Sequence, residues 1–228
     1  MDVALADLEA RHDAVFFGAG LGADSALAAD GAELPGVEGA VHFIERMKLS
    51  ATDLAGIEMA TVVGGGNTAV DAVRELIGLG IGSVTMVYRG DEAAMSGYAH
   101  EWSEAKREGA RAVWRAQPLA YLGDGAVTGL RCALLDASKK PIAGEEIELP
   151  TDLVLLAIGQ GKLGDLLAGL PGIEVARGVI VTDANGRTGR GGWYAGGDAA
   201  NGGKEVVNAA AEGKRAALAI HADLEARS

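Results

Sequence analysis

Three consecutive glycines have the spacing needed to hold the phosphates of a bound nucleotide. Gly64, Gly65 and Gly66 lie between the apolar run 60–63 and an apolar pattern of helical period, and with Ala69 they complete a Gly-x-Gly-x-x-Ala sequence. In such a turn Gly64 permits the sharp bend, Gly66 lets a pyrophosphate approach the backbone, and Ala69 lets the helix pack closely on the strand. The helix N-terminus adds free N–H groups and a partial positive charge.

A second predicted strand, residues 83–88, follows this helix, so a complete strand–turn–helix–strand unit surrounds the glycines. The pattern therefore predicts a dinucleotide-binding turn. The alternative is a tight strand–helix turn that binds no ligand. In the nucleotide interpretation, the residues that contact the cofactor are Gly64, Gly65, Gly66, Asn67, Thr68 and Ala69.

The end of the second strand indicates which nucleotide is bound. An acid there hydrogen-bonds the ribose hydroxyls of NAD, whereas a cation favours the 2′-phosphate of NADP. The strand ends at Arg89, and the next acid, Asp91, lies beyond Gly90. Arg89 therefore favours NADP(H) by its charge and its fork of donors. The alternative is an exposed arginine without a ligand.

No other group of residues has the spacing of a catalytic site. The chain shows no Ser-His-acid set and no metal-ligand cluster, and its four histidines are scattered, which predicts surface positions for His12, His42, His100 and His221. Hydride transfer fits this absence, because the cofactors carry that chemistry and the protein supplies binding and orientation.

Composition excludes several classes of function. The 228 residues carry a net charge of −12, which argues against nucleic acid as a partner. No apolar run approaches about 18 residues, and the acidic N-terminus lacks the basic start of a signal peptide, so we expect no membrane span and a cytoplasmic protein. The single cysteine, Cys132, excludes an internal disulfide and cannot hold an iron–sulfur cluster through four thiolates.

Short strands and turns flank the central unit. Residues 13–18 predict a buried strand, and Gly18–Ala23 repeats the Gly-x-Gly-x-x-Ala spacing. Polar residues, glycine and proline follow within a few positions, so this second match predicts a loop and not a nucleotide-binding turn. Residues 41–48 predict a helix and residues 92–109 predict another that ends at Gly109.

The second half of the chain changes to strand-like patterns. Runs at 112–116, 126–135 and 145–149 predict an antiparallel meander. Further strands are predicted at 152–158, 178–183 and 193–198, and an alanine-rich helix at 204–227.

Five segments together resemble one flavoprotein family. They are Val62–Ala72, Val87–Arg89, Ala157–Gln160, Tyr194–Ala199 and Glu205–Ala217. Their sequences and order resemble the flavoprotein small subunit of NADPH-dependent glutamate synthase and the related NADPH-oxidising part of dihydropyrimidine dehydrogenase. The resemblance runs from about residue 13 to the end, and its motifs do not separate the members of the group.

The resemblance implies an α/β fold with two nested dinucleotide-binding domains. A Rossmann-like NAD(P)-binding domain would be inserted in a truncated FAD-binding domain, with the antiparallel meander as an addition. The expected division is 1–52 for a remnant of the FAD-binding domain plus connector, 53–162 for the NADP(H)-binding domain, and 163–228 for the C-terminal segment of the FAD-binding domain.

The resemblance also implies further cofactor contacts and a reaction. Gly159 and Gln160 would end the strand that returns toward the flavin, Gly197 and Asp198 would contact the ribityl–phosphate region of FAD, and the flavin pyrimidine end would face Glu205, Val206 and Val207. Hydride would pass from NADPH to FAD, and electrons would pass on to iron–sulfur centres or a partner subunit.

Two departures from the family qualify this interpretation. Gly90 stands where family members often carry a second arginine, which weakens the expected preference for NADP. The cysteine-rich segment and the FAD glycine motif that precede this region in the family are absent from the sequence. We therefore expect a C-terminal fragment that purifies without stoichiometric flavin. We also expect a homodimer or some aggregation through unpaired strand edges at 13–17 and 179–181.

Three alternatives remain at this point. The chain could be the NADPH/FAD module of a dihydropyrimidine dehydrogenase, or a non-catalytic regulatory module that binds NADP(H). A disulfide reductase like thioredoxin reductase is disfavoured, because the sequence has no cysteine pair.

Overall fold

A computed structural model describes residues 4–49 and 54–227, which form two compact units. One unit contains residues 23–159, and the other combines residues up to 22 with those from 160 onward. The first unit is therefore inserted into the second along the chain. The expected boundary at residues 52 and 53 lies outside the described residues, and the observed insertion begins about 30 residues earlier in the chain.

A five-stranded parallel sheet forms the centre of the inserted unit. Its order is β3 (Val37–Gly39), β10 (Leu153–Leu156), β4 (Met59–Val63), β5 (Ser83–Tyr88) and β6 (Arg111–Trp114). β3 belongs to this sheet, and α2 (Ala40–Leu49), the helix that follows it, packs on the sheet. Residues 23–49 are therefore part of the inserted unit and not of the expected FAD-domain remnant at 1–52. The predicted strands at 60–63, 83–88 and 152–158 are confirmed.

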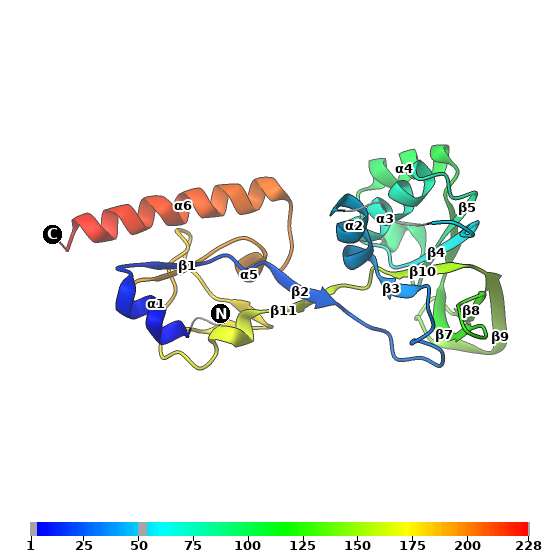
Figure 1. Cartoon of the computed structure of the whole chain (residues 1–228), viewed down its shortest axis with the longest axis horizontal. Helices are drawn as coiled ribbons and strands as arrows, with labels where there is room; N and C mark the ends of the chain where they lie inside the picture. Colours follow the sequence, from blue (N-terminus) through cyan, green and yellow to red (C-terminus); the bar gives the residue numbers. More distant parts are fainter. Residues whose placement is uncertain (1–3, 50–53, 228) are drawn as a thin grey trace. The chain divides into compact units, whose positions relative to one another are not determined.

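Three helices cover one face of this sheet (Figure 1). They are α2 (Ala40–Leu49), α3 (Asn67–Gly78) and α4 (Ala99–Glu108). Leu153 and Leu155 of β10 point into their side and pack in one core with Phe43, Leu76 and Trp102. The predicted helix at 92–109 is in fact the short 3-10 helix η1 (Glu92–Ala94) followed by α4, which ends at Gly109 with a φ of 111° as expected.

An antiparallel meander covers the opposite face (Figure 1). It consists of β7 (Ala116–Leu122), β8 (Gly129–Leu135) and β9 (Pro141–Pro150). Val154 and Leu156 of β10 alternate toward this side and share a core with Leu130 and Cys132. Burial on both faces explains why β10 is a continuous apolar run.

The first strand of the predicted meander was wrong. Residues 112–114 belong to β6, which pairs in parallel with β5 in the central sheet. Arg115, with a left-handed φ of 51°, separates β6 from β7, and β7 takes the place in the meander. A short apolar strand pattern does not encode its pairing partner, because parallel and antiparallel neighbours both accept it.

The second Gly-x-Gly-x-x-Ala match does not begin a helix, as predicted, but its second half is a strand and not the predicted loop. Residues Leu21–Asp24 form β2, an extended strand paired with β11 (Gln160–Lys162) in a two-stranded sheet. An extended strand presents no helix N-terminus to a phosphate, so this match lacks the context of a nucleotide-binding turn.

Small sheets and one long helix form the other unit. β1 (Val15–Phe17) pairs in parallel with β14 (Trp193–Ala195), and β12 (Val175–Ala176) pairs with β13 (Val179–Ile180). Its apolar core includes Leu167, Ile180 and Trp193. The remaining elements of this unit are α1 (Leu5–Arg11), η2 (Gly164–Leu167), α5 (Asp198–Asn201) and α6 (Val206–Glu225).

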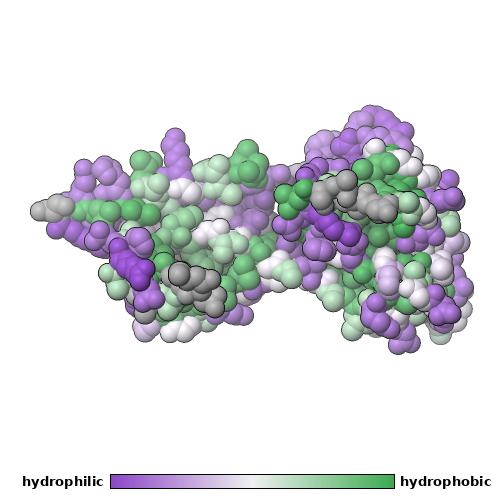
Figure 2. Space-filling model, in the orientation of Figure 1, coloured by the Kyte–Doolittle hydropathy of each residue, from purple (hydrophilic) through white to green (hydrophobic). Residues whose placement is uncertain are grey.

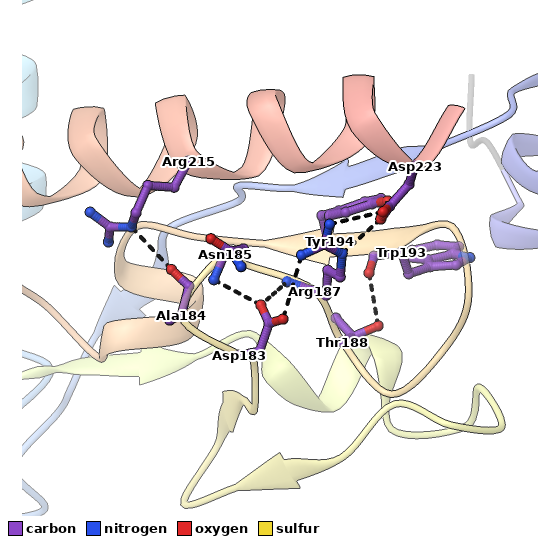
Figure 3. A network of polar contacts seen from close by, with 9 residues as sticks. All are labelled: Asp183, Ala184, Asn185, Arg187, Thr188, Trp193, Tyr194, Arg215 and Asp223. Carbon is purple, nitrogen blue, oxygen red and sulfur yellow. Dashed lines mark hydrogen bonds and ion pairs between the residues drawn. The ribbon is translucent and has the colours of Figure 1, made fainter. Parts of the chain in front are cut away.

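A polar network attaches the C-terminal half of α6 to its own unit (Figure 3). Arg187 donates Nε and Nη2 to the two carboxylate oxygens of Asp223 at 2.7 and 2.8 Å. The Tyr194 hydroxyl donates to the same carboxylate at 2.6 Å, and Asp183 accepts the Arg187 backbone N–H at 2.9 Å. The Arg187 guanidinium, followed by the Tyr194 hydroxyl, holds the pKa of Asp223 well below its usual range.

We expect Asp223→Asn to lower the melting temperature at pH 7 and to lose this effect in acid. A carboxylate with a depressed folded-state pKa contributes stability above its unfolded pKa, about 3.9, and this contribution is lost as the pH falls through the folded value. Thermal unfolding of both proteins at pH 7, 4 and 2 measures the change. Asp13→Asn is the matched control, since Asp13 is exposed in the same unit; a constant difference at all three pH values would contradict the assignment.

Candidate functional site

The first two glycines of the central motif are required by the turn itself. Gly64 has a left-handed φ of 148°, and a Cβ there would lie 2.3 Å from the Ala157 carbonyl oxygen. A Cβ on Gly65 would lie 2.5 Å from the Tyr88 ring. Neither position can hold a side chain without displacing its neighbours, so these glycines let β4 turn sharply into α3.

Gly66 differs from its two neighbours because it faces open space. It occupies the N-cap position of α3 in an extended conformation, and no side chain caps this end of the helix. A Cβ on Gly66 would meet the Ser96 hydroxyl oxygen at 3.5 Å and no other atom outside its chain neighbours within 4 Å. The fold therefore leaves room at Gly66 that a bound group can use, as the dinucleotide turn requires.

Gly66 borders a pocket of about 670 Å³ within the inserted unit. Apart from Leu27, the segments that line it lie at or after the carboxyl ends of four neighbouring strands, β10, β4, β5 and β6. Ligands of open α/β sheets bind at this edge. The lining residues are Leu27, Val63, Gly64, Gly65, Gly66, Thr68, Val87, Tyr88, Arg89, Ser96, Ala116, Gln117, Pro118, Ala157, Ile158 and Gly159.

Six of the residues expected to contact a cofactor thus share one pocket: Gly64, Gly65, Gly66, Thr68, Arg89 and Gly159. Three others do not line it. Ala69 is fully buried in the core, as expected for close helix packing. Asn67 accepts the Tyr98 backbone N–H at 3.0 Å, and Gln160 belongs to the other unit, where its Nε2 donates to the Gly22 carbonyl at 2.9 Å.

Arg89 is exposed at the rim of this pocket. Within residues 4–49 and 54–227 its guanidinium makes no hydrogen bond or ion pair with the protein. An exposed arginine without a protein partner presents its donors to solvent, where a phosphate can take them in bidentate geometry.

The remaining expected residues lie in the other unit. Gly197, with a φ of 63°, donates its N–H to Glu212 Oε2 at 2.7 Å, and Asp198 accepts the Lys204 N–H at 3.0 Å. Glu205 is the N-cap residue of α6. Val206 and Val207 are 79% and 69% exposed, and Figure 2 shows hydrophobic residues at the surface along α6.

Several lining residues were missed from the sequence. Leu27 comes from the segment before β3, Gln117 and Pro118 come from β7, and Ser96 lies between η1 and α4. Ile158 adjoins the expected Gly159, so its position alone could have identified it. The other four reach the pocket only through tertiary packing, and no spacing in the sequence marks them.

The described part of the chain shows neither a metal-binding cluster nor a reactive cysteine. All four histidines are exposed, as predicted, and among residues 4–49 and 54–227 no group of His, Cys, Asp or Glu could hold a metal ion. Cys132 is fully buried, and burial raises the pKa of its thiol to about 12. Such a thiol forms almost no thiolate at neutral pH, so it is unreactive in disulfide exchange. No described helix is long and apolar enough to cross a membrane.

The chain has curated relatives in several redox enzymes. It is 33% identical over 238 residues to the NADP(+)-dependent formate dehydrogenase subunit beta of Moorella thermoacetica, with 96% of this chain and 33% of that protein covered. It is 31% identical over 252 residues to the glutamate synthase [NADPH] small chain of Azospirillum brasilense, with 100% of this chain and 52% of that protein covered. The resemblance to glutamate synthase small subunits is confirmed, and the chain spans about a third to a half of these relatives.

Solved structures share the fold. FprA from Mycobacterium tuberculosis, in complex with NADPH, matches 98% of this chain and 66% of its own with a TM-score of 0.74 at 20% identity. Thioredoxin reductase from T. acidophilum matches 92% of this chain and 65% of its own with a TM-score of 0.73 at 22% identity. The expected α/β fold is confirmed, with a Rossmann-like unit inserted between the two chain segments of the other unit.

The family model agrees with the relatives and the fold. The model described as pyridine nucleotide-disulphide oxidoreductase matches residues 7–213, which is most of the sequence. The chain therefore belongs to the pyridine nucleotide-disulphide oxidoreductase family.

Proposed function

We propose that this chain binds NADP(H) and serves as part of an NADPH-dependent flavin oxidoreductase similar to the glutamate synthase small subunit. The observation that carries the proposal is that the open glycine, Gly66, and Arg89, whose guanidinium has no partner in the described part of the chain, border the same pocket. Together these two residues suit the two charged regions of NADP(H). The pyrophosphate needs a bare helix N-terminus, as at Gly66, and the 2′-phosphate needs a positive side chain, as at Arg89.

The residues of the inserted unit bind and orient the nucleotide. Gly64 and Gly65 fix the turn. The N–H groups of the first turn of α3 donate to the pyrophosphate, which lies against Gly66, and Arg89 pairs with the 2′-phosphate. NADPH, when bound, supplies a hydride, and the protein's part is to hold it in position and keep water away. The apolar lining from Leu27, Pro118 and Ile158 serves the second purpose.

The unit of residues 1–22 and 160–228 is proposed to contribute to an FAD site. Gly197 and Asp198 begin α5 after β14, and the start of α6 leaves Val206 and Val207 exposed, as an apolar ring system needs. Electrons would pass on to a partner subunit or to iron–sulfur centres. The names of the relatives support a partner, since they are a beta subunit and a small chain. A homodimer and a cytoplasmic location remain part of the proposal.

Calorimetric titration of the purified chain tests nucleotide binding. We expect saturable binding of one NADPH per chain and weaker binding of NADH. Absence of binding to either nucleotide would overturn the proposal. Addition of FAD separates an electron-transfer protein from a module that only senses NADP(H): flavin absorbance that bleaches with NADPH supports the first, and nucleotide binding without any flavin uptake supports the second.

A further inference from the structure

A second arginine, Arg115, directly follows β6, the strand next to β5, and immediately precedes Ala116, which lines the pocket. β5 and β6 end side by side, with Tyr88 opposite Trp114, so the residues that follow them lie at the same edge. Arg115 donates its backbone N–H to the Gly90 carbonyl at 2.9 Å and accepts the Leu135 N–H at 2.7 Å. These bonds hold Arg115 in its left-handed conformation, with φ at 51°. A bulky residue with positive φ is uncommon and marks a position that the surrounding structure imposes.

Arg115 forms an ion pair with Asp91, the first acid that follows β5 in the chain. Arg115 Nη2 lies 3.3 Å from Asp91 Oδ2. The other oxygen of Asp91 accepts the Ala94 N–H at 3.1 Å, which caps η1. An acid at the end of this strand selects NAD when it is free to bind the ribose hydroxyls. Both oxygens of Asp91 thus already have partners within the protein, and these contacts compete with a hydrogen bond to a ribose.

The neighbouring position cannot supply the second cation. A Cβ on Gly90 would lie 2.7 Å from the Tyr88 ring and 3.3 Å from the Ala94 Cβ. The Tyr88 hydroxyl in turn donates to the Ala94 carbonyl at 2.9 Å, which fixes the ring against Gly90. An arginine at residue 90 would therefore have to displace a bonded tyrosine.

The charged residues that follow β5 and β6 have a net positive charge that depends on Arg115. Arg89 and Arg115 are positive and Asp91 is negative, while the nearby Glu92 is neutralised by Lys106 at 2.5 Å. The local sum is +1 with Arg115 and zero without it. The 2′-phosphate of NADP(H) is negative and binds better where the local net charge is positive, because a nearby negative charge repels it.

We infer that Arg115 strengthens the preference for NADP(H) over NAD(H) by engaging Asp91, as a positioning residue for the proposed nucleotide site. This inference rests on the proposed function. In this inference Arg115, which follows β6, supplies the second positive charge that is missing at Gly90.

The test compares dissociation constants for NADPH and NADH in four proteins. Arg115→Asn removes the charge, and asparagine tolerates the left-handed backbone. Because exposed ion pairs contribute about 0.2–1 kcal/mol, we expect the NADPH preference to fall up to about fivefold. Adding Asp91→Asn to this variant should restore most of the preference. Arg111→Ala, at the opposite end of the same strand, is the matched control and should change nothing.

The outcomes separate this inference from the proposed function. If the wild type binds neither nucleotide, the proposed function fails and the inference fails with it. If the wild type prefers NADPH and Arg115→Asn keeps the same preference, the inference alone is overturned. If the preference falls and Asp91→Asn does not restore it, Arg115 does not act through Asp91, and the inference is again overturned.

Discussion

Gly66→Val is expected to abolish binding of NADP(H) while the protein keeps its melting temperature. The valine side chain would project into the pocket, where the nearest atom outside the chain neighbours of Gly66, the Ser96 hydroxyl oxygen, is 3.5 Å from the Cβ position. Because the fold leaves this space open, the folded protein loses little. The pyrophosphate would lose its approach to the helix N-terminus, whose N–H groups and partial charge bind it.

Titration with NADPH and thermal unfolding, measured on the same preparation, check this expectation. Gly65→Val is the matched comparison, since its Cβ would lie 2.5 Å from the Tyr88 ring. Overpacking of this kind costs roughly 1–3 kcal/mol, so Gly65→Val should melt at a lower temperature. Retained binding in Gly66→Val would mean that the glycine motif is only a packing turn.

Arg89→Ala should remove most of the preference for NADPH over NADH. Arg89 lines the pocket, and its guanidinium makes no hydrogen bond or ion pair with the described part of the protein. Its removal therefore breaks no such internal contact. A charge-assisted hydrogen bond is worth about 1.5–3 kcal/mol, which corresponds to roughly 10- to 150-fold in the dissociation constant. The affinity for NADH should change little, because NADH carries no 2′-phosphate.

Competitive or direct titration of both nucleotides against both proteins measures this preference. Arg89→Lys is the control that keeps the charge and loses the bidentate fork, and we expect it to retain part of the preference. A wild type with equal affinities, or an alanine variant that still prefers NADPH, would show that another group recognises the 2′-phosphate.

Local sequence determined the central unit of this protein. The apolar run before Gly64, the three glycines and the helical period after them specify a buried strand, a turn and a helix, because each step is set by neighbours within a few residues. β4, α3 and β5 lie where the pattern placed them. The polar residues after Gly18–Ala23 likewise excluded a second turn of this kind.

Pairing between distant segments was harder to predict. Residues 112–116 have a strand pattern that suits either the parallel sheet or the meander, and β6 joined the sheet because it lies beside β5 after α4 packs on α3. Residues 23–49 carry no motif of the inserted unit. Nevertheless β3 adds an edge strand to its sheet, and α2 is one of the helices that cover the sheet. Such choices depend on which apolar faces remain to be buried.

The sequence by itself thus determined the glycine turn, the cation that follows β5 and the absence of a reactive cysteine pair, since these depend on residue type and short spacing. Only the tertiary structure decided that Gly66 faces open space while Gly64 and Gly65 do not, that Arg115 engages Asp91, and that Leu27 and Gln117 border the same pocket as Arg89. The physical reason is that contacts across a sheet edge join residues far apart in the chain, and their geometry is fixed only when the strands and the layers around them pack together.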